Sequence, residues 1–181
     1  LKPSKAQLFT EKIVYLGFEV SKHGINAIKK RVEAIQLIPP PTSLKELRSF
    51  NQLISFYRRY IAGASKKLKP LTDLTQEKYQ PFKGWAPDSD AQVAFEGIKK
   101  DLMTAPVLRH PDLTIPFIIT IDACKEGMGA VLEQDFPVEE RTVSKSGKLT
   151  ERHPVYFISR KTIDAETRYS ASKLEARATL W

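Results

Sequence analysis

Five polar side chains recur at helical spacing between positions 48 and 59, and together they could bind a nucleic-acid duplex. They are Arg48, Asn51, Gln52, Ser55 and Arg59. At about 100° per residue these side chains project from one side of a helix, opposite its apolar positions. Such a face can follow a duplex. An ordinary solvated helix face has the same pattern, so this alternative stays open.

The helix that carries this face is well marked in the sequence. Pro39, Pro40 and Pro41 end any preceding helix, and Ser43 followed by Glu46 has the spacing of a capping box. Apolar residues then recur three and four positions apart. They are Leu47, Phe50, Leu53, Ile54, Tyr57 and Ile61. The pattern predicts an amphipathic helix with one buried and one polar side.

The charge is concentrated in the same half of the chain. Residues 1–83 contain 16 Lys and Arg against 6 Asp and Glu, a net +10, whereas residues 84–181 contain 13 against 15, a net −2. A positive field attracts a phosphate backbone, but it also suits a membrane surface or an acidic protein. Ordinary solvated lysines would give the same count, so the charge alone does not choose between these partners.

The remaining periodicity predicts a chain of mixed helices and strands. A strand pair is expected over 9–20, with a turn at His23 and Gly24. Helices are predicted over 26–37, 70–76 and 88–102, the last with Val93, Phe95, Ile98 and Leu102 as its apolar positions. Residues 81–87 read as a linker.

The last third of the chain changes to a strand pattern. Strands are expected over 116–124, 127–134 and 154–162, and they form a meander. The charged stretch 135–152 is predicted to be an extended loop. A final helix opens near Ser170 or Ser172.

Composition excludes several classes of protein. The single cysteine, Cys124, rules out an internal disulfide framework and cannot make a structural zinc site. The three histidines, His23, His110 and His153, share no metal-binding spacing. No apolar run is long enough to span a bilayer and no signal peptide is recognisable, so an intracellular protein, cytoplasmic or nuclear, is expected.

A linear series of strings resembles the reverse transcriptase of gypsy-type LTR retrotransposons. The first two are YLGFEVSKHGI at 15–25 and ELRSFNQLISFYRRYI at 46–61. They are followed by APVL at 105, PD at 111, PFIITIDAC at 116, GAVLEQ at 129 and YFISRKT at 156. The order of so many separated strings is more specific than any one of them.

The resemblance implies an α+β fold in four parts. Residues 1–25 correspond to the end of the palm with its primer-grip-like hairpin, and 26–80 to a helical thumb. Residues 81–112 correspond to a linker and connecting helix, and 113–181 to a truncated RNase H-like domain made of a three-stranded meander and one helix.

The resemblance also implies that the helix lies along the minor groove of the primer and template and that YLGFEV grips the primer. The candidate nucleic-acid-binding residues are Tyr15, Gly17, Lys45, Arg48, Asn51, Gln52, Ser55 and Arg59. One position departs from the family. Gln52 stands where the family has a glycine that lets the helix approach the nucleic acid closely.

Two carboxylates match the family's RNase H site, in which acidic side chains hold two magnesium ions. Asp122 and Glu175 are therefore the candidate catalytic and metal-binding residues, with Lys173 where the family has another glutamate. Mg²⁺ is expected only if residues outside this sequence complete the site. As alternatives, Asp122 could be a turn residue and Glu175 the capping-box partner of Ser172. No Asp-Asp pair of a polymerase centre occurs.

Two functions from different classes follow. The chain is either part of an active reverse transcriptase and ribonuclease H that holds an RNA/DNA hybrid or duplex, or a catalytically inactive binding module derived from a retrotransposon. A truncated RNase H sheet would leave the strand with Ile119 and Ile121 unpaired, which predicts a protein partner or a homodimer there. Alternatively, the connecting helix near Phe95 to Leu102 covers that edge. No membrane partner is expected.

Overall fold

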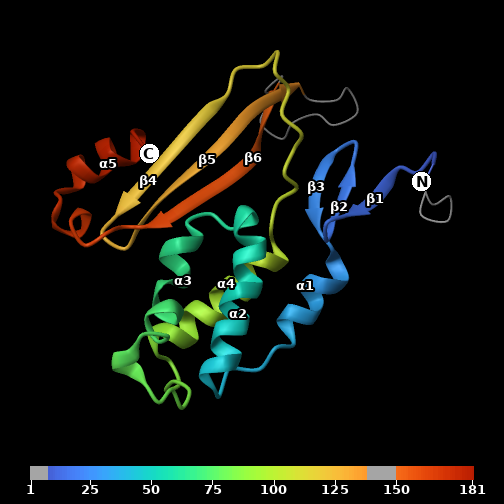
Figure 1. The fold of residues 1–181 in the computed structure, drawn as a ribbon. Coiled ribbons are helices and arrows are strands. Elements are labelled where there is room, and N and C mark those ends of the chain that lie inside the picture. The colour runs from blue at the N-terminus through green and yellow to red at the C-terminus, as the bar shows by residue number, and fades with distance from the viewer. Residues whose placement is uncertain (1–7, 138–149) are drawn as a thin grey trace, which may run out of the picture.

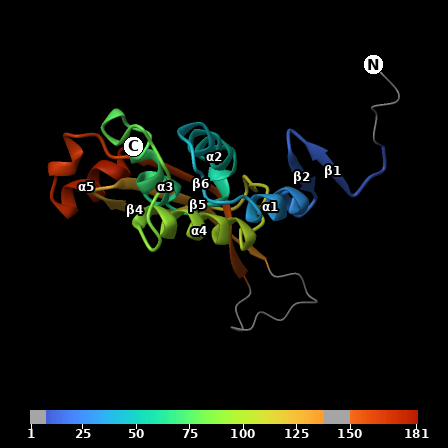
Figure 2. The same cartoon turned by 90° about the horizontal axis from the view of Figure 1, so that it is seen from below.

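The computed structural model describes residues 8–137 and 150–181. A small sheet of strands β1 to β3 leads into helices α1 to α4, and a larger sheet of strands β4 to β6 follows with helix α5 (Figure 1). In two perpendicular views α2, α3 and α4 lie on one side of the larger sheet, and α5 lies at its far end (Figures 1 and 2). The mixed α and β fold expected from the sequence is confirmed.

The small sheet has one more strand than predicted. β1 (Lys12–Tyr15), β2 (Phe18–Ser21) and β3 (Gly24–Ala27) pair antiparallel in that order. The first turn uses Leu16 and Gly17, both with positive φ, as a two-residue hairpin turn requires. The helix predicted from residue 26 instead begins at Lys29, because Ile25 pairs with Leu108 in an isolated bridge and holds β3 extended.

The polar-faced helix predicted after the three prolines is present. It follows α1 (Lys29–Gln36) as α2 (Leu44–Tyr57) and continues into a 3₁₀ turn, η2 (Arg58–Tyr60). Ser43 is its N-cap, and its hydroxyl accepts from the Glu46 N–H at 3.3 Å. The Glu46 carboxylate in turn accepts from the N–H of Thr42 at 2.8 Å. Both partners of the predicted capping box therefore hold the start of α2.

Two later helices differ from their predicted forms. α3 (Ala64–Asp73) begins before Pro70 and continues through it, although the sequence pattern placed a helix start at that proline. Burial of Leu68 and Leu71 on either side outweighs the hydrogen bond that proline removes. α4 (Asp90–Met103) buries Phe95 but leaves Val93 66% exposed. Val93, one of the four apolar positions named for this helix, therefore lies outside the core.

The larger sheet is the predicted three-stranded meander. β4 (Ile118–Cys124), β5 (Gly127–Pro137) and β6 (Thr150–Lys161) are antiparallel, and α5 (Ala171–Thr179) follows. The predicted loop over 135–152 is shorter than expected, because Asp135 and Arg152 pair within the ladder and form an ion pair at 2.9 Å. Residues 138–149 of that stretch lie outside the described residues.

Two separate hydrophobic clusters support these parts. The larger one joins the helices to Phe18 of β2 and Leu108, and it includes Leu47, Phe50 and Phe95. The smaller one consists of Met128 with Leu174 and Ala178 of α5, beside Ile121 and Ala123 of β4. Phe157 is the residue of the larger sheet that packs against the helical cluster. The sheet and the helices therefore have their own cores.

Candidate nucleic-acid interface and carboxylate positions

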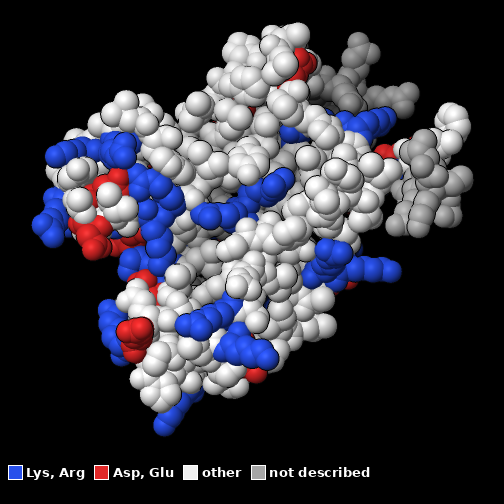
Figure 3. All heavy atoms as spheres, in the orientation of Figure 1, with Lys and Arg blue, Asp and Glu red and all other residues white. Residues whose placement is uncertain are grey.

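An exposed polar stripe follows α2. Lys45, Arg48, Gln52 and Ser55 are all exposed and lie three or four residues apart, so they share one side of the helix; we call them the α2 stripe. Neither Lys45 nor Arg48 forms an ion pair or hydrogen bond with another described residue. Basic side chains stand over α2 with little acidic surface between them (Figure 3). Lys45 and Arg48 can therefore meet a phosphate backbone without first breaking protein contacts, whereas the Ser55 hydroxyl already donates to the backbone oxygen of Asn51 at 2.9 Å.

Two residues predicted for the same face contact the protein instead. Asn51 is half-buried, and its amide donates to the backbone oxygen of Leu71 in α3 at 3.5 Å. Arg59 lies in η2, where its guanidinium carbon is 5.1 Å from the ring centre of Phe18 and 5.5 Å from that of Tyr156. These are cation–π distances. Arg59 therefore joins the small sheet to the larger one.

The hairpin with Tyr15 and Gly17 docks on the helices. Tyr15 is exposed on β1, whereas Gly17 has φ +86° and faces α1 and α2. A Cβ at Gly17 would lie 2.8 Å from a guanidinium nitrogen of Arg31 and 3.0 Å from the ring of Phe56. Phe56 stacks on Phe18 with ring centres 4.6 Å apart. Glycine is needed here because the turn approaches the helices closely.

Asp122 lies in a cleft between the helices and the larger sheet. It is exposed on β4, and the cleft of about 700 Å³ is formed with α3, α4 and β5. Basic and acidic side chains border it together. They are Lys66, Lys67, Asp90 and Asp101. Lys67 is paired with Asp101 at 2.6 Å.

Glu175 lies on the other side of the sheet. Successive residues of a strand point to opposite faces, and α5 packs on the face that carries Ile121 and Ala123. Asp122, between them, points to the face where Gly129 approaches Gly63 at the start of α3. Asp122 and Glu175 are both exposed, and no hydrogen bond or ion pair joins their side chains. Nor is Glu175 a capping-box partner of Ser172, since the N-cap of α5 is Ser170, which accepts from the Lys173 N–H.

The described carboxylates do not form a magnesium centre by themselves. A two-metal site needs several carboxylates around ions about 4 Å apart. Within residues 8–137 and 150–181 no group of three His, Cys, Asp or Glu side chains could hold a metal ion. The lysines around Asp122 further disfavour a cation there.

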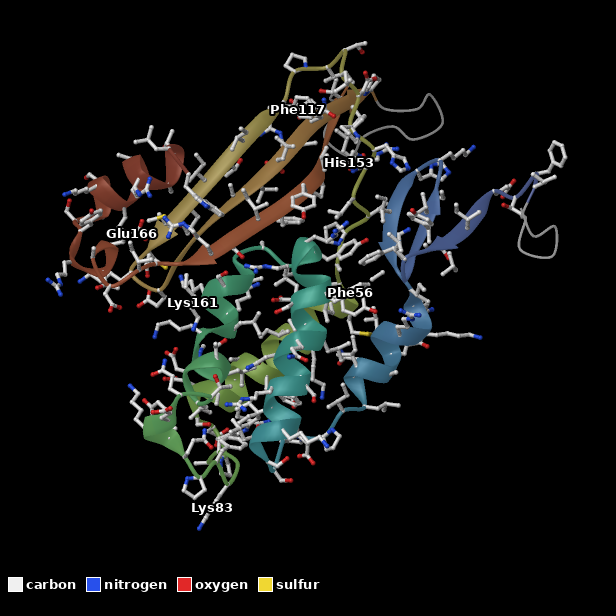
Figure 4. All side chains as sticks on the ribbon, viewed as in Figure 1. Phe56, Lys83, Phe117, His153, Lys161 and Glu166 are labelled. Carbon is white, nitrogen blue, oxygen red and sulfur yellow. The ribbon has the colours of Figure 1, made fainter. Side chains whose placement is uncertain are left out.

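A carboxylate that the sequence reasoning missed is the most constrained one described. Glu166 is buried, and Arg160 donates two hydrogen bonds to it, both at 2.7 Å, while Arg177 and the Ile163 N–H add two more. These bonds, chiefly those from Arg160, lower its pKa to about 2. Figure 4 shows Glu166 where β6, the following turn and α5 meet. Arg160, Glu166 and Arg177 come from β6, the following turn and α5, so no period within one helix or strand marked this cluster in the sequence.

The fold and the sequence together define the class of protein. Residues 87–181 match the family described as the RNase H-like domain found in reverse transcriptase, and the chain belongs to that family. The matched region includes α4 as well as the larger sheet and α5.

Relatives along the whole chain are Pol polyproteins. The retrovirus-related Pol polyprotein from transposon opus of Drosophila melanogaster is 34% identical over 184 residues, covering 98% of this chain and 17% of the relative. The Pol polyprotein from transposon gypsy of the same organism is 32% identical, covering 98% and 16%. The chain therefore spans about a sixth of the length of these relatives. The resemblance to gypsy-type Pol polyproteins is confirmed.

Solved structures share the fold. A foamy viral protease-reverse transcriptase in complex with an RNA/DNA hybrid has a TM-score of 0.74 and 21% identity, covering 98% of this chain and 22% of that one. The same kind of protein in complex with double-stranded DNA has a TM-score of 0.73 and 21% identity, covering 97% and 28%. No helix among the described residues is long and apolar enough to cross a membrane.

Proposed function

We propose that this chain is the thumb-to-RNase H region of a retrotransposon reverse transcriptase and that it holds duplex or hybrid nucleic acid on the α2 stripe. The observation that carries the proposal is the pair of unpartnered basic residues, Lys45 and Arg48, on one exposed side of a capped helix. Residues 1–25 would then be the end of the palm, 26–80 the thumb, 81–112 the connecting segment and 113–181 the RNase H-like part.

The chemistry of the stripe suits a backbone rather than a base sequence. Lys45 and Arg48 would neutralise phosphates, and Gln52 would donate or accept hydrogen bonds beside them. The Ser55 hydroxyl, which donates to the Asn51 backbone oxygen, would accept one. The foamy viral relatives of the fold bind a hybrid and a DNA duplex, which supports this partner class. Tyr15, exposed on the docked hairpin, would contribute at the primer end.

The assignment of Asp122 and Glu175 to an RNase H site remains a prediction, and so does Mg²⁺ as the cofactor. No catalytic step is assigned to either residue, because the described carboxylates do not surround a common point. The second candidate function is a binding module without catalysis. The exposed edge of β4, where Ile119 is 62% exposed, would suit a protein partner of such a module.

Binding of fluorescent 20-base-pair hybrid and DNA duplexes, measured by anisotropy at several salt concentrations, tests the proposal. The unmodified chain should bind both without sequence preference and lose affinity steeply with salt. The double variant Lys45→Glu/Arg48→Glu should bind at least about tenfold more weakly, with a salt slope smaller by roughly 2.

The matched control is Lys125→Glu/Arg168→Glu, which makes the same change in charge at exposed positions of the other half. It should bind nearly as well as the unmodified chain. Equal losses for the two double variants would mean that net charge, and not the α2 stripe, attracts the nucleic acid.

A further inference from the structure

Polar side chains contribute much of the contact between the helices and β6. The two hydrophobic clusters are separate, and Phe157 is the partly buried sheet residue that reaches the helical cluster. Contacts between α3 or η2 and β6 also include hydrogen bonds, an ion pair and one cation–π contact. Polar contacts of this kind join parts that can move relative to each other.

Arg58 lies at the centre of this contact. Its Nη2 donates to the Ser65 hydroxyl at 2.8 Å within the helical part and to the backbone oxygen of Ser159 on β6. The Ser65 N–H donates to the Ser159 hydroxyl at 3.1 Å. One guanidinium therefore bridges the two parts, and Ser65 and Ser159 complete the bridge.

A second polar contact joins β6 to the other end of α3. Lys161 of β6 donates to Asp73 of α3 at 3.2 Å, and Asp73 also accepts from Lys69 at 2.7 Å. Figure 4 shows Lys161 in the space between the larger sheet and α3. Arg58 and Lys161 thus fasten β6 to the two ends of α3.

Glycines allow the backbones to come close between these contacts. A Cβ at Gly129 would lie 3.7 Å from the Cα of Gly63, and a Cβ at Gly127 would lie 3.5 Å from the backbone nitrogen of Lys66. A larger side chain at either position would enter the space between the sheet and α3.

The opposite side of the contact is open. The cleft of about 700 Å³ separates α4 from β4 and β5, and it is lined by Val93, Gly97, Thr120 and Asp122 among others. The segment that joins α4 to β4, residues 104–117, contains an isolated bridge at Leu108 and no helix or longer strand. The sheet is therefore attached along β6 and free along β4.

We propose that Arg58 is a releasable latch that holds the larger sheet against α3. When its bridge to Ser159 opens, β6 moves away from the start of α3 about the remaining contact between Lys161 and Asp73, and the cleft at Asp122 widens. This motion changes the distance between the α2 stripe and the RNase H-like sheet. It requires no nucleic acid, so it stands apart from the proposed binding function.

The amide of Ser65 reports the latch directly. It lies in the first turn of α3, where an N–H has no partner within the helix, and its hydrogen bond goes to Ser159. Its hydrogen exchange, measured by NMR, therefore follows opening of the contact. The amide of Leu71, inside the same helix and buried, follows unfolding of α3.

In the variant Arg58→Ala the Ser65 amide should exchange about tenfold faster or more, while Leu71 stays unchanged. Gly129→Leu, which wedges the contact without altering Arg58, should have the same effect. Arg48→Ala, a matched removal of an exposed arginine on α2, should change neither amide. The proposal is overturned if Ser65 exchanges equally fast in both the unmodified chain and Arg58→Ala, or if Leu71 accelerates together with Ser65.

Discussion

Individual residues in this chain act mainly by joining parts of the fold. Arg59 was predicted to contact nucleic acid, yet it lies between the rings of Phe18 and Tyr156 and so connects the two sheets. Glu166 attracts no notice in the sequence, yet two arginines and a backbone N–H converge on its buried carboxylate. Arg59 and Glu166 have partners within the protein, whereas Lys45 and Arg48 have none among the described residues. This difference comes from their positions in the tertiary structure and not from their residue types.

The pH dependence of unfolding should reveal Glu166. Its pKa is about 2 in the folded chain against 4.5 for an ordinary glutamate, so the unfolded chain binds more protons between these values. Its contribution to stability is complete above about pH 4.5 and is lost as the pH falls toward 2. In Glu166→Gln we expect a lower thermal midpoint at pH 7 and a weaker acid dependence below pH 4.5.

Glu175→Gln is the control, because Glu175 is exposed and its side chain has no described partner. It should leave the midpoint and its acid dependence as they are in the unmodified chain. Thermal unfolding followed by circular dichroism at pH 7, 4 and 3 measures both variants. If the thermal midpoint of Glu166→Gln fell by the same amount between pH 7 and pH 3 as that of the unmodified chain, the role assigned to Glu166 would be contradicted.

At the scale of the element, the start of α2 is fixed by local interactions. Ser43 and Glu46 satisfy N–H groups at positions 46 and 42, which a helix cannot satisfy within itself. Ser43→Ala should therefore lower the free energy of unfolding by about 1 kcal/mol. Ser49→Ala, an exposed serine inside the same helix, should be neutral or slightly stabilising.

Urea unfolding of the two alanine variants measures this difference. Since α2 carries the stripe, Ser43→Ala should also weaken duplex binding slightly at temperatures where the helix begins to fray. Equal stability of the two variants would show that packing of Leu47 and Phe50, and not the cap, sets the start of α2.

At the scale of the whole molecule, the described residues offer a surface for binding nucleic acid but no metal centre for cleaving it. The α2 stripe is exposed and basic, whereas no group of three His, Cys, Asp or Glu side chains within residues 8–137 and 150–181 could hold a metal ion. The chain should therefore bind an RNA/DNA hybrid without cleaving it in Mg²⁺ or Mn²⁺. A gel assay with labelled RNA in the hybrid measures this, and cleavage that Asp122→Asn abolishes would refute it.

The sequence by itself determined the family and most of the elements. The order of separated strings indicated a gypsy-type Pol polyprotein, and the spacing of Leu47, Phe50 and Ile54 predicted α2, because helix periodicity and capping are local properties. The three-stranded meander followed from the alternation after residue 116 for the same reason. The bounds of α3 and β3 were missed, because burial of Leu71 and pairing of Ile25 with Leu108 override the local signals.

Only the tertiary structure decided which polar residues are free and which are bound. Asn51 and Gln52 are neighbours in the sequence, yet Asn51 contacts α3 and Gln52 is exposed. Arg58 and Arg59 look alike, yet one bridges to Ser159 and the other stacks on two rings. Arg58 and Ser159 lie 101 residues apart in the sequence, and they meet only because α3 packs against β6. The periodicity of a helix or strand is a local property, so it cannot predict such a contact.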